Sequence, residues 1–216
     1  MTHPIGILGG TFDPPHRAHL ALARAALERL GLSRVVWIPA GWPPHRALPQ
    51  ASAEDRLAMV RLAIADEPRF RLDDSEAKNA STSFTVNTLE RLRKQLGPDR
   101  PLVLLMGADA FHGLPSWHRW EDILRLAHIA VATRPGYPLT KLTGALADLF
   151  GRCRLASADF SHRPAGGIHA FELSAGTVSA TEVRALVAAG ASDAKLLELL
   201  PPAVLDYIRR HRLYRR

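Results

Sequence analysis

Short apolar runs alternate along this chain with longer segments in which apolar residues recur every three or four positions. A short apolar run is typical of a strand buried on both faces, as in a parallel sheet. These runs predict strands at 5–8, 35–38, 70–72, 102–106, 129–133 and 168–173. The periodic segments predict helices at 20–30, 52–64, 85–96, 139–150, 179–189, 195–200 and 202–211.

Strands that alternate with helices in this way predict an α/β fold. We expect a Rossmann-like, doubly wound parallel sheet with helices on both faces. The last part of the chain, about 179–216, forms a small helical extension in this interpretation. A length of 216 residues fits a single domain over 1–216.

Several helix ends carry local signals. Ser52 and Ser179 each precede an acidic residue by three positions, which is the pattern of a helix N-cap. Gly97, followed by proline, ends the helix 85–96. The polar segments 74–83 and 157–167 are predicted loops.

The junction between the first strand and the first helix has an unusual composition. Residues 9–19 read Gly-Gly-Thr-Phe-Asp-Pro-Pro-His-Arg-Ala-His. Two glycines allow a ligand to approach the backbone closely, and the free amides of a helix start attract anions. His16 and His19 lie three positions apart, so they share one face of the first turn. We expect both to donate hydrogen bonds to a phosphate group.

Composition and charge indicate which partners and which cellular compartment the sequence favours. The formal net charge is +7 and the pI is near 10.3, which indicates anionic partners. No apolar run approaches the length of a membrane span, and the start of the chain shows no signal-peptide pattern. One cysteine, Cys153, fits a reducing cytoplasm. The arginines of 209–216 are interpreted as a solvated helix end rather than an RNA-binding tail.

Three other segments carry candidate chemistry: 39–46, 107–118 and 178–184. The first two follow predicted strands, as 9–19 does, so they are expected at one edge of the sheet, where α/β folds bind ligands. The third begins a helix and supplies hydroxyl groups and a guanidinium, which suit phosphate, from Ser179, Thr181 and Arg184.

The segment 9–19 resembles the nucleotidyltransferase signature, in which G-T-F-D-P precedes H-x-G-H, with Ala18 in place of the family glycine. The whole chain resembles the nicotinate-mononucleotide adenylyltransferase family. The matching motifs are Pro43-Pro44-His45-Arg46, Ser83-Phe84-Thr85, Gly107-Ala108-Asp109, Pro115-Ser116-Trp117, Arg134-Pro135-Gly136 and Val178-Ser179-Ala180-Thr181-x-x-Arg184. Many family members have asparagine at the position of Ala40 and tyrosine at that of His118.

The resemblance implies adenylyl transfer from ATP to nicotinate mononucleotide, which gives nicotinate adenine dinucleotide and pyrophosphate. It implies catalytic roles for His16 and His19. The implied ATP-binding residues are Gly9, Gly10, Thr11, Phe12, His19, Ser179, Thr181 and Arg184. The implied nicotinate-nucleotide-binding residues are His45, Arg46, Thr85, Asp109, Trp117, His118 and Arg134. Mg²⁺ is expected to bind through the ATP phosphates rather than at a protein metal site.

Other interpretations stay open on the sequence. A related enzyme could use another acceptor, such as nicotinamide mononucleotide or phosphopantetheine, or transfer a cytidylyl group. A nucleic-acid-binding protein would explain the high pI, but the chain has no recognised nucleic-acid motif, so we do not expect that partner. Trp120 is expected in the core and Asp13 in a turn before Pro14. The oligomeric state is left open.

Overall fold

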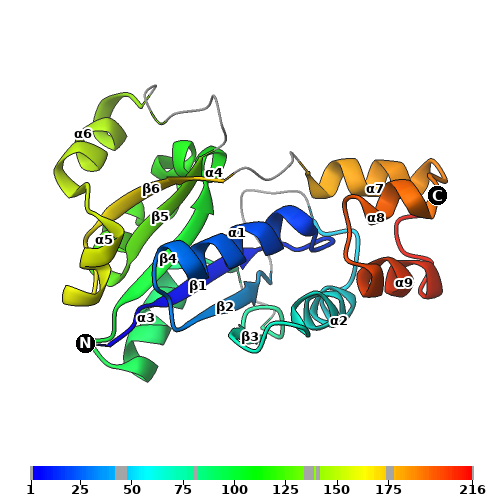
Figure 1. Cartoon of the computed structure of the whole chain (residues 1–216), viewed down its shortest axis with the longest axis horizontal. Helices are drawn as coiled ribbons and strands as arrows, with labels where there is room; N and C mark the ends of the chain where they lie inside the picture. Colours follow the sequence, from blue (N-terminus) through cyan, green and yellow to red (C-terminus); the bar gives the residue numbers. More distant parts are fainter. Residues whose placement is uncertain are drawn as a thin grey trace. The chain divides into compact units, whose positions relative to one another are not determined.

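The structure is a computed structural model that describes residues 2–41, 48–79, 82–133, 139, 142–173 and 178–215. Its centre is a six-stranded, all-parallel sheet with helices around it (Figure 1). The strands are β1 (Ile5–Gly10), β2 (Arg34–Pro39), β3 (Phe70–Leu72), β4 (Leu102–Gly107), β5 (His128–Thr133) and β6 (Ile168–Glu172). Their order is β3-β2-β1-β4-β5-β6. Strands β2 and β3 therefore lie on one side of β1, and strands β4, β5 and β6 lie on the other side. This order is that of the Rossmann fold and confirms the predicted fold class.

Each predicted helix has a counterpart in the structure, in most cases with shifted ends. The α-helices are α1 (Arg17–Arg29), α2 (Ala53–Ile64), α3 (Thr85–Leu96), α4 (Ala108–His112), α5 (Ile123–Leu126), α6 (Gly144–Cys153), α7 (Ala180–Ala188), α8 (Asp193–Leu197) and α9 (Pro202–Arg210). The short helices α4 and α5 are not among the predicted ones. Both predicted serine caps are confirmed, because the Ser52 and Ser179 side chains accept hydrogen bonds from the amides of Asp55 and Glu182.

Three boundaries were predicted wrongly. Strand β1 continues through Gly9 and Gly10, which we expected in the following turn. Helix α6 begins at Gly144 rather than at 139, and Gly144 has a φ of +59°, which suits its lack of a side chain. The segment 157–167, predicted as a loop, contains a 3-10 helix at Ser157–His162.

The chain forms two compact units. Unit 1 comprises residues 1–8, 22–36 and 84–174, and unit 2 comprises 9–21, 37–83 and 175–216. Strands β1 and β2 and helix α1 contribute residues to both units. The expectation of a single domain stays a prediction.

Unit 1 is built on the pairing of β4 with β1 and β5, and of β5 with β6. In this register Gly6 lies beside Val103, and Val103 beside His128. A Cβ on Gly6 would lie 2.8 Å from Leu32 Cδ1, so β1 has no room there for a larger residue. Every residue of β5 is buried, as the continuous apolar run predicted.

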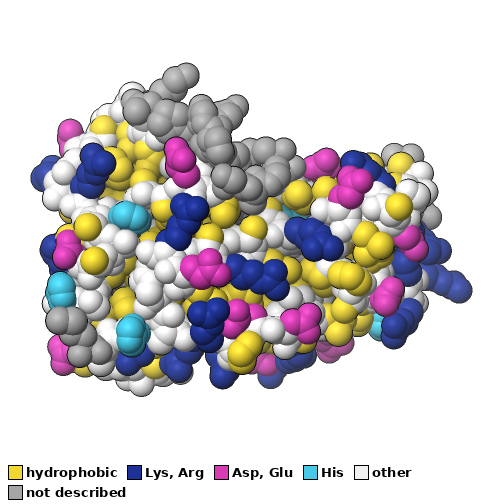
Figure 2. Space-filling model, viewed as in Figure 1, with side chains coloured by type: hydrophobic (Ala, Val, Ile, Leu, Met, Phe, Trp, Pro, Cys, Tyr) yellow, Lys and Arg dark blue, Asp and Glu magenta, His cyan; other side chains and the backbone are white. Residues whose placement is uncertain are grey.

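Unit 2 contains the three C-terminal helices, which gather with α2 (Figure 1). Basic and acidic side chains are mixed over α7, α8 and α9 (Figure 2). Arg209 Nη2 lies 2.7 Å from Asp193 Oδ1, and Arg210 lies 3.8 Å from Asp206. The arginines that end α9 therefore have acidic neighbours, in keeping with their interpretation as a helix end. No helix in the described part of the chain is long and apolar enough to cross a membrane.

Candidate active site

The loop that follows β1 is anchored by an aromatic side chain. Phe12 has a φ of +50°, and its ring is 2% exposed and packs against Trp37 at a centroid distance of 5.3 Å. A Cβ on Gly10 would lie 3.0 Å from this ring, whereas one on Gly9 would meet nothing within 4 Å. Gly10 thus makes room for Phe12, and Gly9 leaves an exposed stretch of backbone. Of the predicted ATP-binding residues, Phe12 has its side chain in the core, so only its backbone is free to meet a ligand.

His16 and His19 lie together, as their spacing predicted. Their rings stack at 3.7 Å, and the edge of His19 meets Phe12 at 5.0 Å. The backbone amide of His16 donates to His19 Nδ1 over 3.2 Å. Since Nδ1 is an acceptor, a neutral His19 carries its proton on Nε2. The loop backbone therefore fixes His19 as an Nε2–H donor.

His16 is the more buried of the two, with 6% exposure. Burial lowers the pKa of His16 to about 4, because desolvation disfavours the charged ring. Its Nδ1 atom is buried without a hydrogen bond to any described residue. At neutral pH His16 is therefore an uncharged ring that supports His19, and it brings no positive charge to the site.

The start of α1 is less open to an anion than we expected. The Arg17 amide donates to the Leu199 carbonyl over 2.8 Å, and the Arg17 side chain donates to the Leu197 carbonyl over 2.9 Å. The His16 amide donates to the Nδ1 atom of His19. The expectation of free amides here was wrong for these two groups, because the end of α8 docks on this turn.

Asp13 does more than form a turn. Its carboxylate is buried and accepts hydrogen bonds from the amides of Gln50 and Ala51, at 2.8 and 3.1 Å. The Tyr214 hydroxyl donates to Asp13 Oδ1 over 2.7 Å. Asp13 therefore joins the loop after β1 to the segment before α2 and to the last residues of the chain.

Arg56 is a site residue that sequence reasoning missed. It lies on α2 with 2% exposure, and its Nη1 donates to the carbonyls of Thr11 and Ala40 over 2.8 and 2.7 Å. Burial lowers the pKa of Arg56, and the negative charge of Asp13 opposes that shift. An arginine in an amphipathic helix is usually exposed, so no local signal marks this one.

Helix α7 presents the residues that we expected to meet phosphate. Ser179 caps the helix, so its hydroxyl oxygen is an acceptor while its O–H is left to donate elsewhere. Arg184 Nη2 lies 3.4 Å from Thr181 Oγ1. Arg184 Nη1 donates to the Asp13 carbonyl over 2.8 Å, so α7 and the loop after β1 meet at this guanidinium.

In unit 1 the structure brings His118 against Phe84, the residue before Thr85. Helix α3 begins at Thr85, as predicted, and its N-cap residue Phe84 makes no side-chain cap. The exposed ring of His118 lies against Phe84, with centroids 4.5 Å apart. Trp117, the neighbour of His118, is half-buried. The start of α3 thus has a histidine close by, and a tryptophan next to that histidine in the chain.

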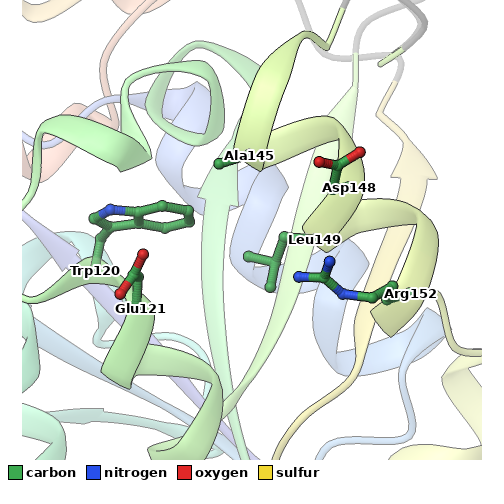
Figure 3. Close-up of a pocket in the computed structure, with 6 residues that line it drawn as sticks. All are labelled: Trp120, Glu121, Ala145, Asp148, Leu149 and Arg152. Atoms are coloured by element: carbon green, nitrogen blue, oxygen red, sulfur yellow. The ribbon is translucent and has the colours of Figure 1, made fainter.

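Asp109 lies exposed in the first turn of α4, directly after β4, as the sequence placed it. Trp120 was expected in the core, and this was wrong. It is half-buried and lines a pocket of about 280 Å³ with Leu149 and Arg152 of α6 (Figure 3). Its neighbour Glu121 lines the same pocket.

The predicted residues His45, Arg46 and Arg134 lie outside the described residues. Within the described ranges, no group of three or more histidine, cysteine or acidic side chains is placed to hold a metal ion.

The chain is similar to known proteins over most of its length. The cytidylyltransferase-like family matches residues 7–186. A "probable nicotinate-nucleotide adenylyltransferase" of Dechloromonas aromatica is 51% identical, over 100% of this chain and 99% of its own. One of Aeromonas hydrophila is 47% identical, over 98% and 97%.

A solved structure shares the fold. The Plasmodium falciparum nicotinic acid mononucleotide adenylyltransferase complexed with NaAD aligns with a TM-score of 0.73 at 16% identity, over 98% of this chain and 97% of its own. At this identity the likeness shows the fold alone. The sequence relatives show the family, and the chain belongs to the nicotinate-nucleotide adenylyltransferases of the cytidylyltransferase-like group.

Proposed function

We propose that this protein transfers the adenylyl group of ATP to nicotinate mononucleotide, a step of NAD biosynthesis. An oxygen of the acceptor phosphate attacks the α-phosphorus of ATP. The bond from that phosphorus to the oxygen bridging to the β-phosphate breaks, and pyrophosphate leaves. A phosphate monoester is ionised near pH 7, so the attacking oxygen needs no general base. The work of the protein is to position the groups and stabilise charge.

The observation that carries this proposal is the fixed orientation of His19. Its Nδ1 accepts a hydrogen bond from the His16 amide, so the donor of the neutral ring is Nε2–H. We assign that donor to the α-phosphate, where charge changes during transfer. A donor held in place before reaction stabilises this charge without reorganising. The stacked, neutral ring of His16 holds His19 in position.

We assign the leaving pyrophosphate to the start of α7. Ser179 has a hydroxyl proton to donate, and Arg184 supplies a guanidinium, whose planar set of donors suits phosphate oxygens. Thr181 is held beside Arg184 and contributes a second hydroxyl. Gly9, Gly10 and Thr11 supply backbone near the nucleotide.

We assign the acceptor to residues of unit 1. The uncapped start of α3 at Thr85 offers amides and a positive dipole end to the nicotinate carboxylate. The Trp117 ring is suited to stack on a pyridine, and His118 adds a donor. Asp109 is assigned to ribose hydroxyls. His45, Arg46 and Arg134 remain proposed contacts on the sequence alone.

We propose that Mg²⁺ arrives with ATP and neutralises phosphate charge when bound. Mg²⁺ usually keeps several waters and binds through few carboxylates plus substrate phosphates. The carboxylate of Asp13 is engaged by two amides and Tyr214, so it is a poor ligand. A cytoplasmic location is likewise proposed, from the single cysteine.

The test is pyrophosphate release from ATP and Mg²⁺ with nicotinate mononucleotide, nicotinamide mononucleotide and phosphopantetheine as acceptors. We expect the first to react fastest and to give a product of the mass of nicotinate adenine dinucleotide. Chelation of Mg²⁺ should stop turnover. Fastest turnover with phosphopantetheine, or none with any acceptor, would refute the assignment.

A further inference from the structure

The last residues of the chain reach back to the loop after β1. Helix α9 ends at Arg210, and a turn then brings the Leu213 amide to the Ile208 carbonyl, at 3.0 Å. Arg212 and Tyr214 have φ values of +53° and +60°. Side chains other than glycine rarely adopt this conformation, and it persists where surrounding contacts determine it. The contact at the end of this turn is the hydrogen bond from Tyr214 to Asp13.

Asp13 also contacts Arg184. Its carbonyl accepts from Arg184 Nη1 over 2.8 Å, and its carboxylate Oδ2 lies 3.8 Å from the same nitrogen. The carboxylate is almost fully buried, and the Arg184 side chain is largely buried. A buried carboxylate and guanidinium this close attract each other strongly.

Three donors now satisfy the Asp13 carboxylate: the amides of Gln50 and Ala51 and the hydroxyl of Tyr214. The hydroxyl stays protonated, because burial and the charge of Asp13 both raise the pKa of Tyr214. A satisfied carboxylate draws Arg184 less strongly than one with an unpaired oxygen. The Tyr214 hydroxyl therefore influences the position of the Arg184 guanidinium through Asp13, without a direct contact.

We propose that Tyr214 is a positioning residue for ATP: its hydroxyl satisfies Asp13, and Arg184 thereby stays available to the triphosphate instead of being captured by the Asp13 carboxylate. The inference rests on the proposed function for the identity of the ligand. It gives the turn after α9 a role in substrate binding in addition to its role in the fold.

The chain offers a matched control. Tyr207 on α9 also donates its hydroxyl to a carboxylate, that of Asp55 on α2, over 2.9 Å. Tyr207→Phe and Tyr214→Phe each remove one hydroxyl that donates to a carboxylate within the same unit. They differ in that only Asp13 contacts Arg184. A general loss of stability would affect both variants, whereas a positioning effect would appear in Tyr214→Phe alone.

The experiment measures kcat/KM for ATP and KM for the acceptor, with the melting temperature of each variant. We expect Tyr214→Phe to lower kcat/KM for ATP about tenfold and to change the acceptor KM less than twofold. Tyr207→Phe should keep wild-type values for both. Equal effects of the two variants on ATP would overturn the proposal.

A second measurement shows whether Tyr214 acts through Arg184. Binding of α,β-methylene ATP is measured by calorimetry for Arg184→Ala, Tyr214→Phe and the double variant. We expect Tyr214→Phe to weaken binding in the wild-type background and to add less than twofold in the Arg184→Ala background. Additive losses would mean that Tyr214 does not act through Arg184. This measurement needs no acceptor, so a failure of the nicotinate assignment leaves its outcome intact.

Discussion

The buried ring of His16 makes the stability of this protein depend on pH. The pKa of His16 falls from 6.5 in the unfolded chain to about 4 in the folded one, because burial disfavours the imidazolium. The folded state thus binds fewer protons than the unfolded state between these two pH values. The contribution of His16 to the free energy of unfolding therefore has its full value above pH 6.5 and decreases as the pH falls toward 4.

The magnitude follows from this shift. For pKa values of 6.5 and about 4, proton linkage removes about 2 kcal/mol from the free energy of unfolding between pH 7 and pH 5. His16→Gln removes the titrating ring and should abolish this part of the pH dependence. Buried His128 also has a lowered pKa, but it is present in both proteins, so its contribution cancels in the comparison.

The assay is urea unfolding of wild type and His16→Gln at pH 7, 6 and 5. The wild type should lose about 2 kcal/mol more than the variant over this range. His162→Gln is the control, because the His162 side chain is exposed, and its Nδ1 lies 3.6 Å from Asp159 Oδ1. It should follow the wild type. Parallel pH profiles for wild type and His16→Gln would refute the reasoning.

Three further outcomes are expected. His19→Ala should lower kcat by about 10² or more, the usual loss for one donor to a developing charge, and near-normal turnover of the folded variant would remove His19 from the site. Arg184→Ala should raise KM for ATP far more than KM for the acceptor, and equal losses would indicate a role in folding only. The kcat/KM for nicotinate mononucleotide should exceed that for its amide by roughly 10²-fold, since charge-assisted hydrogen bonds at Thr85 and His118 need the carboxylate. Comparable turnover of the amide would contradict this acceptor preference and leave adenylyl transfer intact.

Features set by neighbouring residues could be predicted from the sequence. The caps at Ser52 and Ser179 and the start of α3 at Thr85 depend on residues within one turn, and the structure confirms them. The strands follow from apolar runs, which report burial on both faces. The start of α6 was missed because an apolar periodicity does not mark where a helix begins.

Contacts between distant residues could not be predicted. Arg56 meets Thr11 across 45 positions, and Tyr214 meets Asp13 across 201. No period or spacing encodes such pairs, and each residue type is common on a surface. Phe12 was predicted to bind ATP, and the burial of its side chain could not be predicted for the same reason, because its core partner Trp37 lies on β2.

Contacts between buried charges and backbone atoms in unit 2 hold the loop after β1 against Ala40, the residue directly after β2. The Ala40 amide donates to the Gly10 carbonyl over 2.9 Å, and the Ala40 carbonyl accepts from Arg56. Both contacts use backbone atoms of Ala40, so they do not depend on the side chain at this position. A buried cation is costly unless it is paired and hydrogen-bonded, and Arg56 has two carbonyls together with the opposing charge of Asp13. Removing the Asp13 carboxylate would take away the negative charge that opposes the desolvation of Arg56. The pair Asp13 and Arg56 therefore holds the loop through main-chain atoms, which leaves the side chains at its surface free to vary.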